Sequence, residues 1–306
     1  VAAAPSSPFG DNVIVFDPSM SPSAIEEVVN GIHAEQVDDE MGTNRWSLLF
    51  KPGTYGTAED PLQIRVGDTT EAAGRGPDPG DAGINGKVES FNRCLRDDAT
   101  TYCVALNNFW RTLSNLTINV NGFGQEGCRA SANFWAVSQA VSLRRVEVTG
   151  GNLSLMDYCS AGPQFASGGF IADSKAAFVI NGSQQQWLTR NSEVGEWSNG
   201  VWNQVFSGVI GAPADTSFPD PPYTTLEKTP LSREKPWLWM DDSGAWKVQV
   251  PAAASGTRGT TWAGAAPRGA RTLDLAEFHI AKPGDSVQSI NSQLARGKNL
   301  LLTPGV

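Results

Sequence analysis

The sequence predicts an all-β protein, and a right-handed parallel β-helix is the architecture that three observations favour. Short apolar runs separated by Asn, Gly and Ser recur as far as residue 210. Several begin about 25 to 30 residues apart, the period at which a solenoid coil returns to the same face. Gly (32) and Pro (19) are abundant, and the helices that an α/β sheet places between its strands are missing. A large β-sandwich is the main alternative.

The expected elements run along the chain in order. Residues 23–34 carry Ile25, Val28, Val29 and Ile32 on one face, which predicts a short amphipathic helix capping an apolar end. Several asparagines stand at the ends of apolar runs and suit the tight corners of the coils, where a left-handed backbone conformation is common; they are Asn115, Asn119, Asn181 and Asn191. The apolar runs predict strands at 46–50, 61–66, 84–88, 113–120, 143–149, 169–173, 178–181 and 205–210.

The opening unit returns near the other end of the sequence. Residues 45–56 and 297–306 are both apolar runs broken by Pro-Gly, and each comes after a short amphipathic helix. We therefore expect a first β-helix domain with its N-terminal cap at 1–211 and a linker with a hairpin brace at 212–284. Residues 285–306 are expected to be the opening helix and strand of a second β-helix domain that continues elsewhere. The alternative is a terminal strand that pairs within its own domain.

The hairpin is expected in the brace, where two alternating strands flank residues 241–244. Just before it, Glu234 and Lys235 are interpreted as a surface pair.

Charge and cysteine content limit the possible partners and the cellular compartment of the protein. The net charge of −9, with no basic run, argues against nucleic acid as a partner. No apolar run is long enough to cross a bilayer, and residues 1–8 resemble the first residues of a mature chain after cleavage of a secretory signal. The cysteine count is even, which suits an oxidising compartment. Cys94 and Cys103 are close enough to clip one loop, leaving Cys128 and Cys159 as a second pair, although three connectivities are possible. We expect a secreted, extracellular protein without a metal or another cofactor.

The densest group of candidate ligand-binding residues lies at 184–204. Hydrolysis of a polysaccharide needs carboxylates for proton transfer, and aromatic planes suit sugar rings. We predict Glu193 and Glu196 as catalytic candidates. Side chains with forked polar groups or large rings are predicted to bind substrate; they are Gln186, Trp187, Arg190, Trp197, Trp202 and Gln204. The alternative is that the tryptophans pack between coils and the glutamates are solvated.

Six motifs resemble a known family. They lie at residues 48–56, 108–117, 184–187, 200–208, 234–237 and 297–305. They resemble secreted tandem β-helix proteins related to glycoside hydrolase family 55, whose members cleave β-1,3-glucans. The resemblance covers nearly the whole chain, which would correspond to the N-terminal half of a longer protein.

The resemblance implies two right-handed β-helices side by side, with a polysaccharide substrate in the cleft between them. It implies an inverting hydrolysis in which the main acid comes from the C-terminal half, here expected as a second polypeptide from the same precursor. No motif transfers a catalytic residue to this chain. The alternatives are a non-catalytic glycan-binding or structural solenoid and a polysaccharide lyase, although an acidic chain suits an acidic sugar poorly.

Overall fold

The computed structural model describes residues 7–95, 101–216, 219–263 and 269–306. Most of residues 1–8, predicted to begin the mature chain after signal cleavage, lies outside these ranges. No helix in the described ranges is long and apolar enough to span a membrane.

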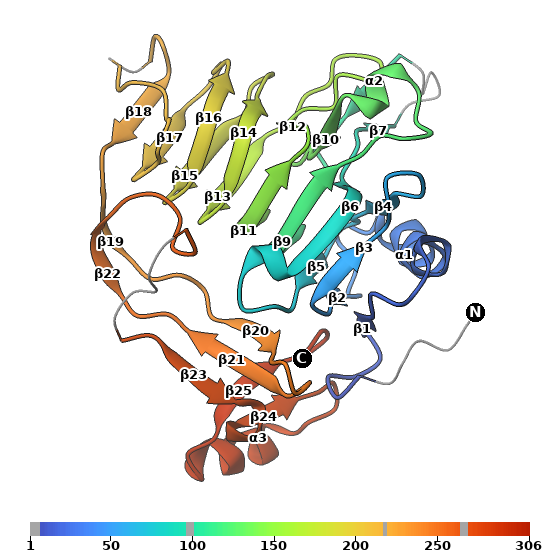
Figure 1. The fold of residues 1–306 in the computed structure, drawn as a ribbon, viewed down its shortest axis with the longest axis vertical. Coiled ribbons are helices and arrows are strands. Elements are labelled where there is room, and N and C mark those ends of the chain that lie inside the picture. Colours follow the sequence, from blue (N-terminus) through green and yellow to red (C-terminus); the bar gives the residue numbers. More distant parts are fainter. Residues whose placement is uncertain (1–6, 96–100, 217–218, 264–268) are drawn as a thin grey trace.

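Sixteen strands form one sheet, in which every pairing is parallel (Figure 1). They are β1 (Val13–Phe16), β2 (Trp46–Phe50), β3 (Gly53–Tyr55), β4 (Leu62–Arg65), β5 (Thr70–Gly74), β6 (Ala82–Glu89), β9 (Thr112–Val120), β10 (Ala132–Phe134), β11 (Ser142–Thr149), β12 (Asn152–Ser154), β13 (Gly168–Ala172), β14 (Lys175–Ile180), β15 (Gln186–Arg190), β16 (Glu193–Ser198), β17 (Gln204–Ser207) and β18 (Tyr223–Leu226). Each strand lies beside the equivalent strand of the next coil: Leu113 pairs with Leu143, and Leu143 with Ile171. An all-β fold built mainly from parallel strands is consistent with a β-helix, whereas a sandwich pairs its strands antiparallel.

The remaining elements are helices, 3₁₀ turns and short strands outside the large sheet. The helices are α1 (Pro22–Gln36), α2 (Gly127–Ala130) and α3 (Val287–Ala295), with 3₁₀ turns at Pro79–Asp81 and Leu275–Glu277. The other strands are β7 (Arg93–Cys94), β8 (Cys103–Val104), β19 (Thr229–Ser232), β20 (Trp237–Met240), β21 (Trp246–Val250), β22 (Ala254–Thr257), β23 (Arg271–Asp274), β24 (Phe278–Ala281) and β25 (Asn299–Leu302). Among them only β24 and β25 pair in parallel. The order β24–α3–β25 therefore repeats the parallel strand, helix and strand of β1–α1–β2.

Four successive coils turn the same corner at a residue with positive φ. Asn115 (φ 51°) and Arg145 (φ 57°) bend β9 and β11 in mid-strand, so that each strand contributes to two faces of the stack. Asp173 (φ 52°) and Asn191 (φ 47°) occupy the same corner in the next two coils, between β13 and β14 and between β15 and β16. Asn and Asp tolerate this conformation, which a β-branched residue resists. Of the four asparagines expected at corners, Asn119 and Asn181 lack a positive φ.

Side chains from alternate strand positions fill the interior of the coils. Leu48, Ile84, Leu113, Leu116 and Ile118 are all 0% exposed. Helix α1 adds Ile25, Val29 and Ile32 to this core. Its N-cap is Ser21, whose hydroxyl accepts from the Ala24 N–H, and Pro22 stands at the first helical position, where its missing N–H costs no hydrogen bond.

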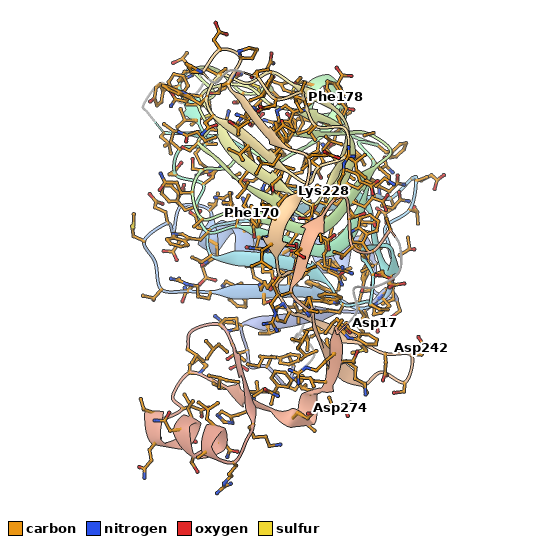
Figure 2. All side chains as sticks on the ribbon, turned by 90° about the vertical axis from the view of Figure 1, so that its left-hand side faces the viewer. Asp17, Phe170, Phe178, Lys228, Asp242 and Asp274 are labelled. Atoms are coloured by element: carbon orange, nitrogen blue, oxygen red, sulfur yellow. A yellow bond between two sulfur atoms is a disulfide. The ribbon has the colours of Figure 1, made fainter. Side chains whose placement is uncertain are left out.

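A second, smaller core joins the stack to the C-terminal elements. The outer faces of β1, β2 and β5 contribute Val13, Val15, Leu49 and Ala73, and Phe9 joins them; Leu238, Trp246, Leu275, Ile280 and Leu301 pack against this group. Figure 1 and Figure 2 show these C-terminal elements lying against the end of the stack that holds β1 and β2. The predicted hairpin, β20 and β21, therefore packs on the outer face of the parallel sheet.

The two disulfides join Cys94 to Cys103 and Cys128 to Cys159, with sequence separations of 9 and 31. Because the entropy removed from the unfolded chain grows with loop length, we expect Cys128→Ala/Cys159→Ala to lower the free energy of unfolding by about 3–4 kcal/mol. Cys94→Ala/Cys103→Ala should cost less, about 2–3 kcal/mol. Urea titration of both double variants tests the order, and a larger loss from the short loop would contradict it.

Candidate functional site

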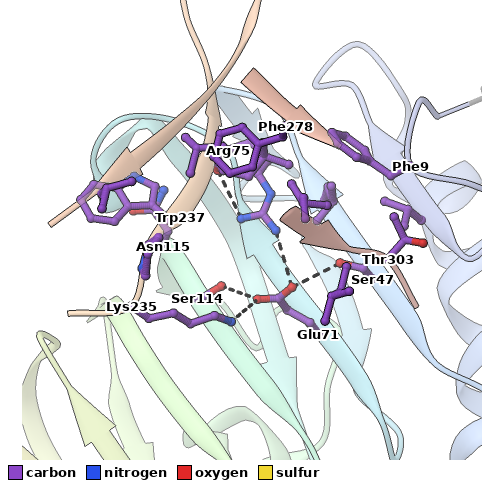
Figure 3. Close-up of a pocket in the computed structure, with 18 of the residues that line it drawn as sticks. Phe9, Ser47, Glu71, Arg75, Ser114, Asn115, Lys235, Trp237, Phe278 and Thr303 are labelled. Atoms are coloured by element: carbon purple, nitrogen blue, oxygen red, sulfur yellow. Dashed lines mark hydrogen bonds and ion pairs between the residues drawn. The ribbon is translucent and has the colours of Figure 1, made fainter. Parts of the chain in front are cut away.

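A carboxylate held by four polar side chains lies on the outer face of the parallel sheet (Figure 3). Glu71 stands on β5 between Ser47 of β2 and Ser114 of β9. The Ser114 hydroxyl donates to Glu71 Oε1 at 2.9 Å and the Ser47 hydroxyl to Oε2 at 3.2 Å. Arg75 Nη2 lies 3.6 Å from Oε2, and Lys235 Nζ lies 4.0 Å from Oε1. These five residues form the Glu71 cluster.

The electrostatic environment of the Glu71 cluster keeps its carboxylate ionised. Burial raises the pKa of Glu71, but Arg75, Lys235 and the two serine hydroxyls outweigh this effect and leave the pKa below its usual value. The side chain is still 26% exposed. Glu71 can therefore accept hydrogen bonds from a ligand, whereas a general acid needs a raised pKa.

The Glu71 cluster opens into a cavity of about 470 Å³ between the sheet and the C-terminal elements. The hairpin contributes Trp237, Leu238 and Val248 to its walls, and β25 contributes Leu300 and Leu301. The volume and the mixture of apolar walls with a few polar groups are typical of small-ligand pockets. Ser47, Glu71 and Lys235 also line an adjoining open groove of about 590 Å³.

Further along the same sheet face, an aromatic ring lies between two arginines. Phe170 pairs in register with Leu188, which is 41% exposed. The guanidinium carbons of Arg144 and Arg190 lie 4.6 Å and 5.3 Å from the Phe170 ring centroid. Glu234, only 8% exposed, accepts from Arg190 Nη2 at 2.8 and 2.9 Å and lies 4.0 Å from Arg144. Glu234 is therefore a buried ion-pair partner rather than half of a surface pair.

The sequence stretch 184–204 does not form one site. It forms β15, β16 and the start of β17, because its residues alternate between core and surface. Trp187 and Trp197 are 2% and 7% exposed and belong to the core, so their rings support the coils instead of facing a ligand. This location corrects the prediction that they bind substrate, and it matches the alternative of tryptophans packing between coils.

The other predicted site residues are dispersed. Gln186 is exposed on β15, Trp202 is 52% exposed in the loop before β17, and Gln204 is 0% exposed, donating to Gln185 O at 2.6 Å. Gln186 and Arg190 lie on the outward face of β15, beside Phe170, and Arg190 contacts the Phe170 ring. The burial of Gln204 corrects its prediction as a substrate contact, because its amide closes a turn between coils.

The two predicted catalytic glutamates lie on β16, on another face of the stack. Glu193 accepts from the Thr260 hydroxyl at 3.1 Å and lies 3.8 Å from Lys175 Nζ. Glu196 is exposed. Neither lines the 470 Å³ cavity. Their catalytic role stays a prediction.

The carboxyl groups with raised pKa values lie inside the protein rather than in the cavity. Burial raises the pKa of Asp68 and of Asp173 to about 6, against the opposing effects of Arg111 and Arg145. Burial also raises the pKa of Glu89. None of the three lines the 470 Å³ cavity. In the described ranges, no group of three His, Cys, Asp or Glu side chains could hold a metal ion.

Sequence reasoning missed the Glu71 cluster because its members are far apart in the chain. Lys235 is brought to Glu71 by the hairpin, and Ser47 and Ser114 by coil stacking. A signal was nevertheless present. Ser47, Glu71 and Ser114 are polar residues that stand among buried apolar residues on their strands, and such positions become direct or diagonal neighbours when coils stack.

Comparison with known proteins gives strong similarity to β-1,3-glucanases. No protein-family model matches the chain. The chain is 45% identical over 299 residues to an exo-β-1,3-glucanase of Streptomyces sp. (strain SirexAA-E / ActE), a match that covers 97% of this chain and 45% of the relative. The structure of sacteLam55A from Streptomyces sp. SirexAA-E matches with a TM-score of 0.84 and 43% identity over 98% of this chain and 50% of that one.

A variant of sacteLam55A in complex with glucose matches with a TM-score of 0.82 and 42% identity, and the match covers 98% of this chain and 50% of that one. The chain thus spans about half the length of the relatives it matches. The resemblance to β-1,3-glucanases of family 55 that the sequence motifs indicate is confirmed.

Proposed function

We propose that this chain belongs to a glycoside hydrolase of family 55 and contributes one wall of a site that cleaves β-1,3-glucan. The observation that carries the proposal is the 45% identity over 97% of the chain to an exo-β-1,3-glucanase. The geometry supports it through a cavity of about 470 Å³ with an ionised carboxylate, hydroxyls and cations on a rigid sheet face. Such groups suit a ligand rich in hydroxyls.

We infer that the stack is a right-handed β-helix capped by α1, with domain limits at 1–211, 212–284 and 285–306. The unit β24–α3–β25, which repeats the arrangement of β1–α1–β2, supports a second β-helix beginning near residue 285. Exposed apolar side chains on this unit support the packing of a further region of the protein against it: Val287 is 74% exposed, Leu302 is 61% exposed and Leu294 is 42% exposed.

We further propose that this second region, whether as a second polypeptide from the same precursor or in one chain, completes the substrate cleft. The proposal is supported by the match to only about half of each relative. An acid from the second region would act by inversion, while Glu71, kept ionised by its neighbours, would bind and orient the sugar. The two disulfides support secretion into an oxidising compartment.

The proposal is tested by incubating the complete natural protein with a soluble β-1,3-glucan and monitoring the product by proton NMR. We expect release of sugar from the β-1,3-glucan but not from a β-1,4-glucan, with the α-anomer appearing first because inversion converts a β-linkage. Initial release of the β-anomer would contradict inversion. Binding of the glucan without any turnover would favour a non-catalytic glycan-binding protein.

We expect Glu71→Ala to lower kcat/KM on β-1,3-glucan about 10- to 100-fold, because a hydrogen bond to a charged group contributes about 1.5–3 kcal/mol. Glu27→Ala, on the exposed side of α1, is the matched control and should leave kcat/KM unchanged. Full activity of Glu71→Ala, at unchanged thermal stability, would remove Glu71 from the site.

A further inference from the structure

Three successive coils share a strained turn just before the start of a strand of the parallel sheet. Thr69, Trp110 and Ala140 precede β5, β9 and β11, and their φ angles are 51°, 54° and 55°. The backbone of Trp110 is tied to the next coil, because its backbone N–H donates to the Gln139 carbonyl oxygen at 3.1 Å. A positive φ is unfavourable for a bulky side chain. Thr69 and Ala140 show that the turn forms without an indole, so the fold alone does not account for Trp110.

The indole of Trp110 faces the solvent rather than the core. Its side chain is 54% exposed and lines the open groove of about 590 Å³ that continues from the Glu71 cluster. The residues before and after it in the stack of turns, Thr69 and Ala140, are small. A ring that is more than half exposed gains little from burial, and backbone strain of this kind is concentrated at functional sites.

The groove also holds polar groups with spare hydrogen-bonding capacity. Trp46 is not one of them: although it borders the groove, its side chain packs against the interior core of the coils and its indole Nε1 is buried. Ser47, Glu71 and Lys235 form the wall shared with the 470 Å³ cavity (Figure 3).

We propose that Trp110 is the stacking platform of an outer sugar subsite, which holds a glucosyl unit of a β-1,3-glucan beyond the 470 Å³ cavity. The apolar C–H face of a pyranose ring packs on the flat indole of Trp110, while Glu71, which lines the same groove, accepts a hydrogen bond from a ring hydroxyl. The proposal rests on the proposed function, since it assigns a further part of the same substrate.

The test compares KM for β-1,3-linked gluco-oligosaccharides of two and six units in the complete natural protein. A chain of six units reaches the outer subsite, whereas a disaccharide bound in the cavity does not. We expect Trp110→Ala to raise KM for the hexasaccharide about tenfold or more, as truncation of a central tryptophan does at many binding sites. KM for the disaccharide should stay unchanged, and Trp110→Phe should restore most of the loss.

Two further variants keep the result interpretable. Trp110→Gly relieves the positive φ, so it should unfold at a higher temperature than the wild type and still bind the hexasaccharide weakly. Phe123→Ala removes a 61% exposed ring outside the groove and should change neither KM. An unchanged hexasaccharide KM in Trp110→Ala, or an equal rise for both sugars, would overturn the subsite. A wild type that hydrolyses no β-glucan would instead overturn the proposed function.

Discussion

Asp68→Ala is expected to lower the free energy of unfolding by about 3–5 kcal/mol, because it leaves a buried cation without its counter-charge. Arg111 is 1% exposed, and its Nη2 lies 3.1 Å from Asp68 Oδ1. The other contacts of the guanidinium are neutral: Nη1 donates to Val66 O and to the Ser90 hydroxyl, and Nη2 donates to Asn108 Oδ1. Neutral acceptors do not replace the lost charge in a desolvated site.

The free energy of unfolding should also depend on pH differently in the wild type and in Asp68→Ala. Burial raises the pKa of Asp68 to about 6, and Arg111 only partly opposes this. A carboxyl whose pKa is higher in the folded state than in the unfolded chain contributes stability that is lost as the pH rises through about 6. We therefore expect the wild type to gain stability from this group between pH 6 and pH 4, and Asp68→Ala to lack that gain.

Urea titration at pH 5 and pH 7.5 measures both effects. Asp17→Ala is the matched control, since Asp17 pairs with Lys51 at 3.1 Å but the two side chains are 43% and 35% exposed. An exposed pair contributes at most about 1 kcal/mol. Equal losses from Asp17→Ala and Asp68→Ala would show that burial of the Asp68–Arg111 pair does not set its contribution.

Arg145→Ala should destabilise the corner of the coils by a similar amount, about 3–5 kcal/mol at pH 8. Arg145 Nη1 lies 3.2 Å from Asp173 Oδ2, and Asp173 is 0% exposed. The same guanidinium contacts Asp78 at 3.2 Å and Asn115 Oδ1 at 3.1 Å, and its carbon lies 3.9 Å from the Trp237 ring centroid. One side chain thus ties the corner to a loop and to the hairpin.

The loss caused by Arg145→Ala should shrink in acid. Burial raises the pKa of Asp173 to about 6 although Arg145 opposes this, so removing Arg145 raises that pKa further. The penalty appears only where Asp173 must be ionised, which means that it grows as the pH rises through about 6 and fades toward pH 4.

Thermal unfolding at pH 4 and pH 8 tests the dependence. Lys175→Ala, in which a 46% exposed lysine is removed from Glu147 and Glu193, should cost less than about 1 kcal/mol at both pH values. A loss from Arg145→Ala that is the same at both pH values would show that the ionised Asp173 is not the cause.

Much of the fold could be predicted because it depends on local patterns. β9 and β11 coincide with the apolar runs at 113–120 and 143–149, since alternation along a strand is set by which side chains face the core. β15 and β16 were not predicted, because their tryptophans and glutamines resemble ligand-binding residues as much as core residues. Trp187 is buried and its Nε1 donates to Gln185 Oε1 at 2.8 Å, a partner that only the folded turn supplies.

The candidate site depends on contacts that no local pattern contains. Glu71 pairs in register with Thr112 of β9 and reaches Ser114 diagonally, two residues further along that strand. It meets Lys235 through the docking of the hairpin. The pKa of Glu71 is lowered by those neighbours, so its chemical role comes from the assembled site rather than from its place in the sequence.

The sequence by itself determined the parallel β architecture, the opening unit that returns near residue 300, and the family resemblance. These depend on periodicity and on motifs that are continuous in the chain. The tertiary structure decided which polar residues share a cavity and which tryptophans are buried. A side chain's neighbours come from other coils, whose lengths vary, and from the docked hairpin. The strand register that pairs Ser47 with Glu71 and the docking that brings Lys235 to them therefore exist only after folding.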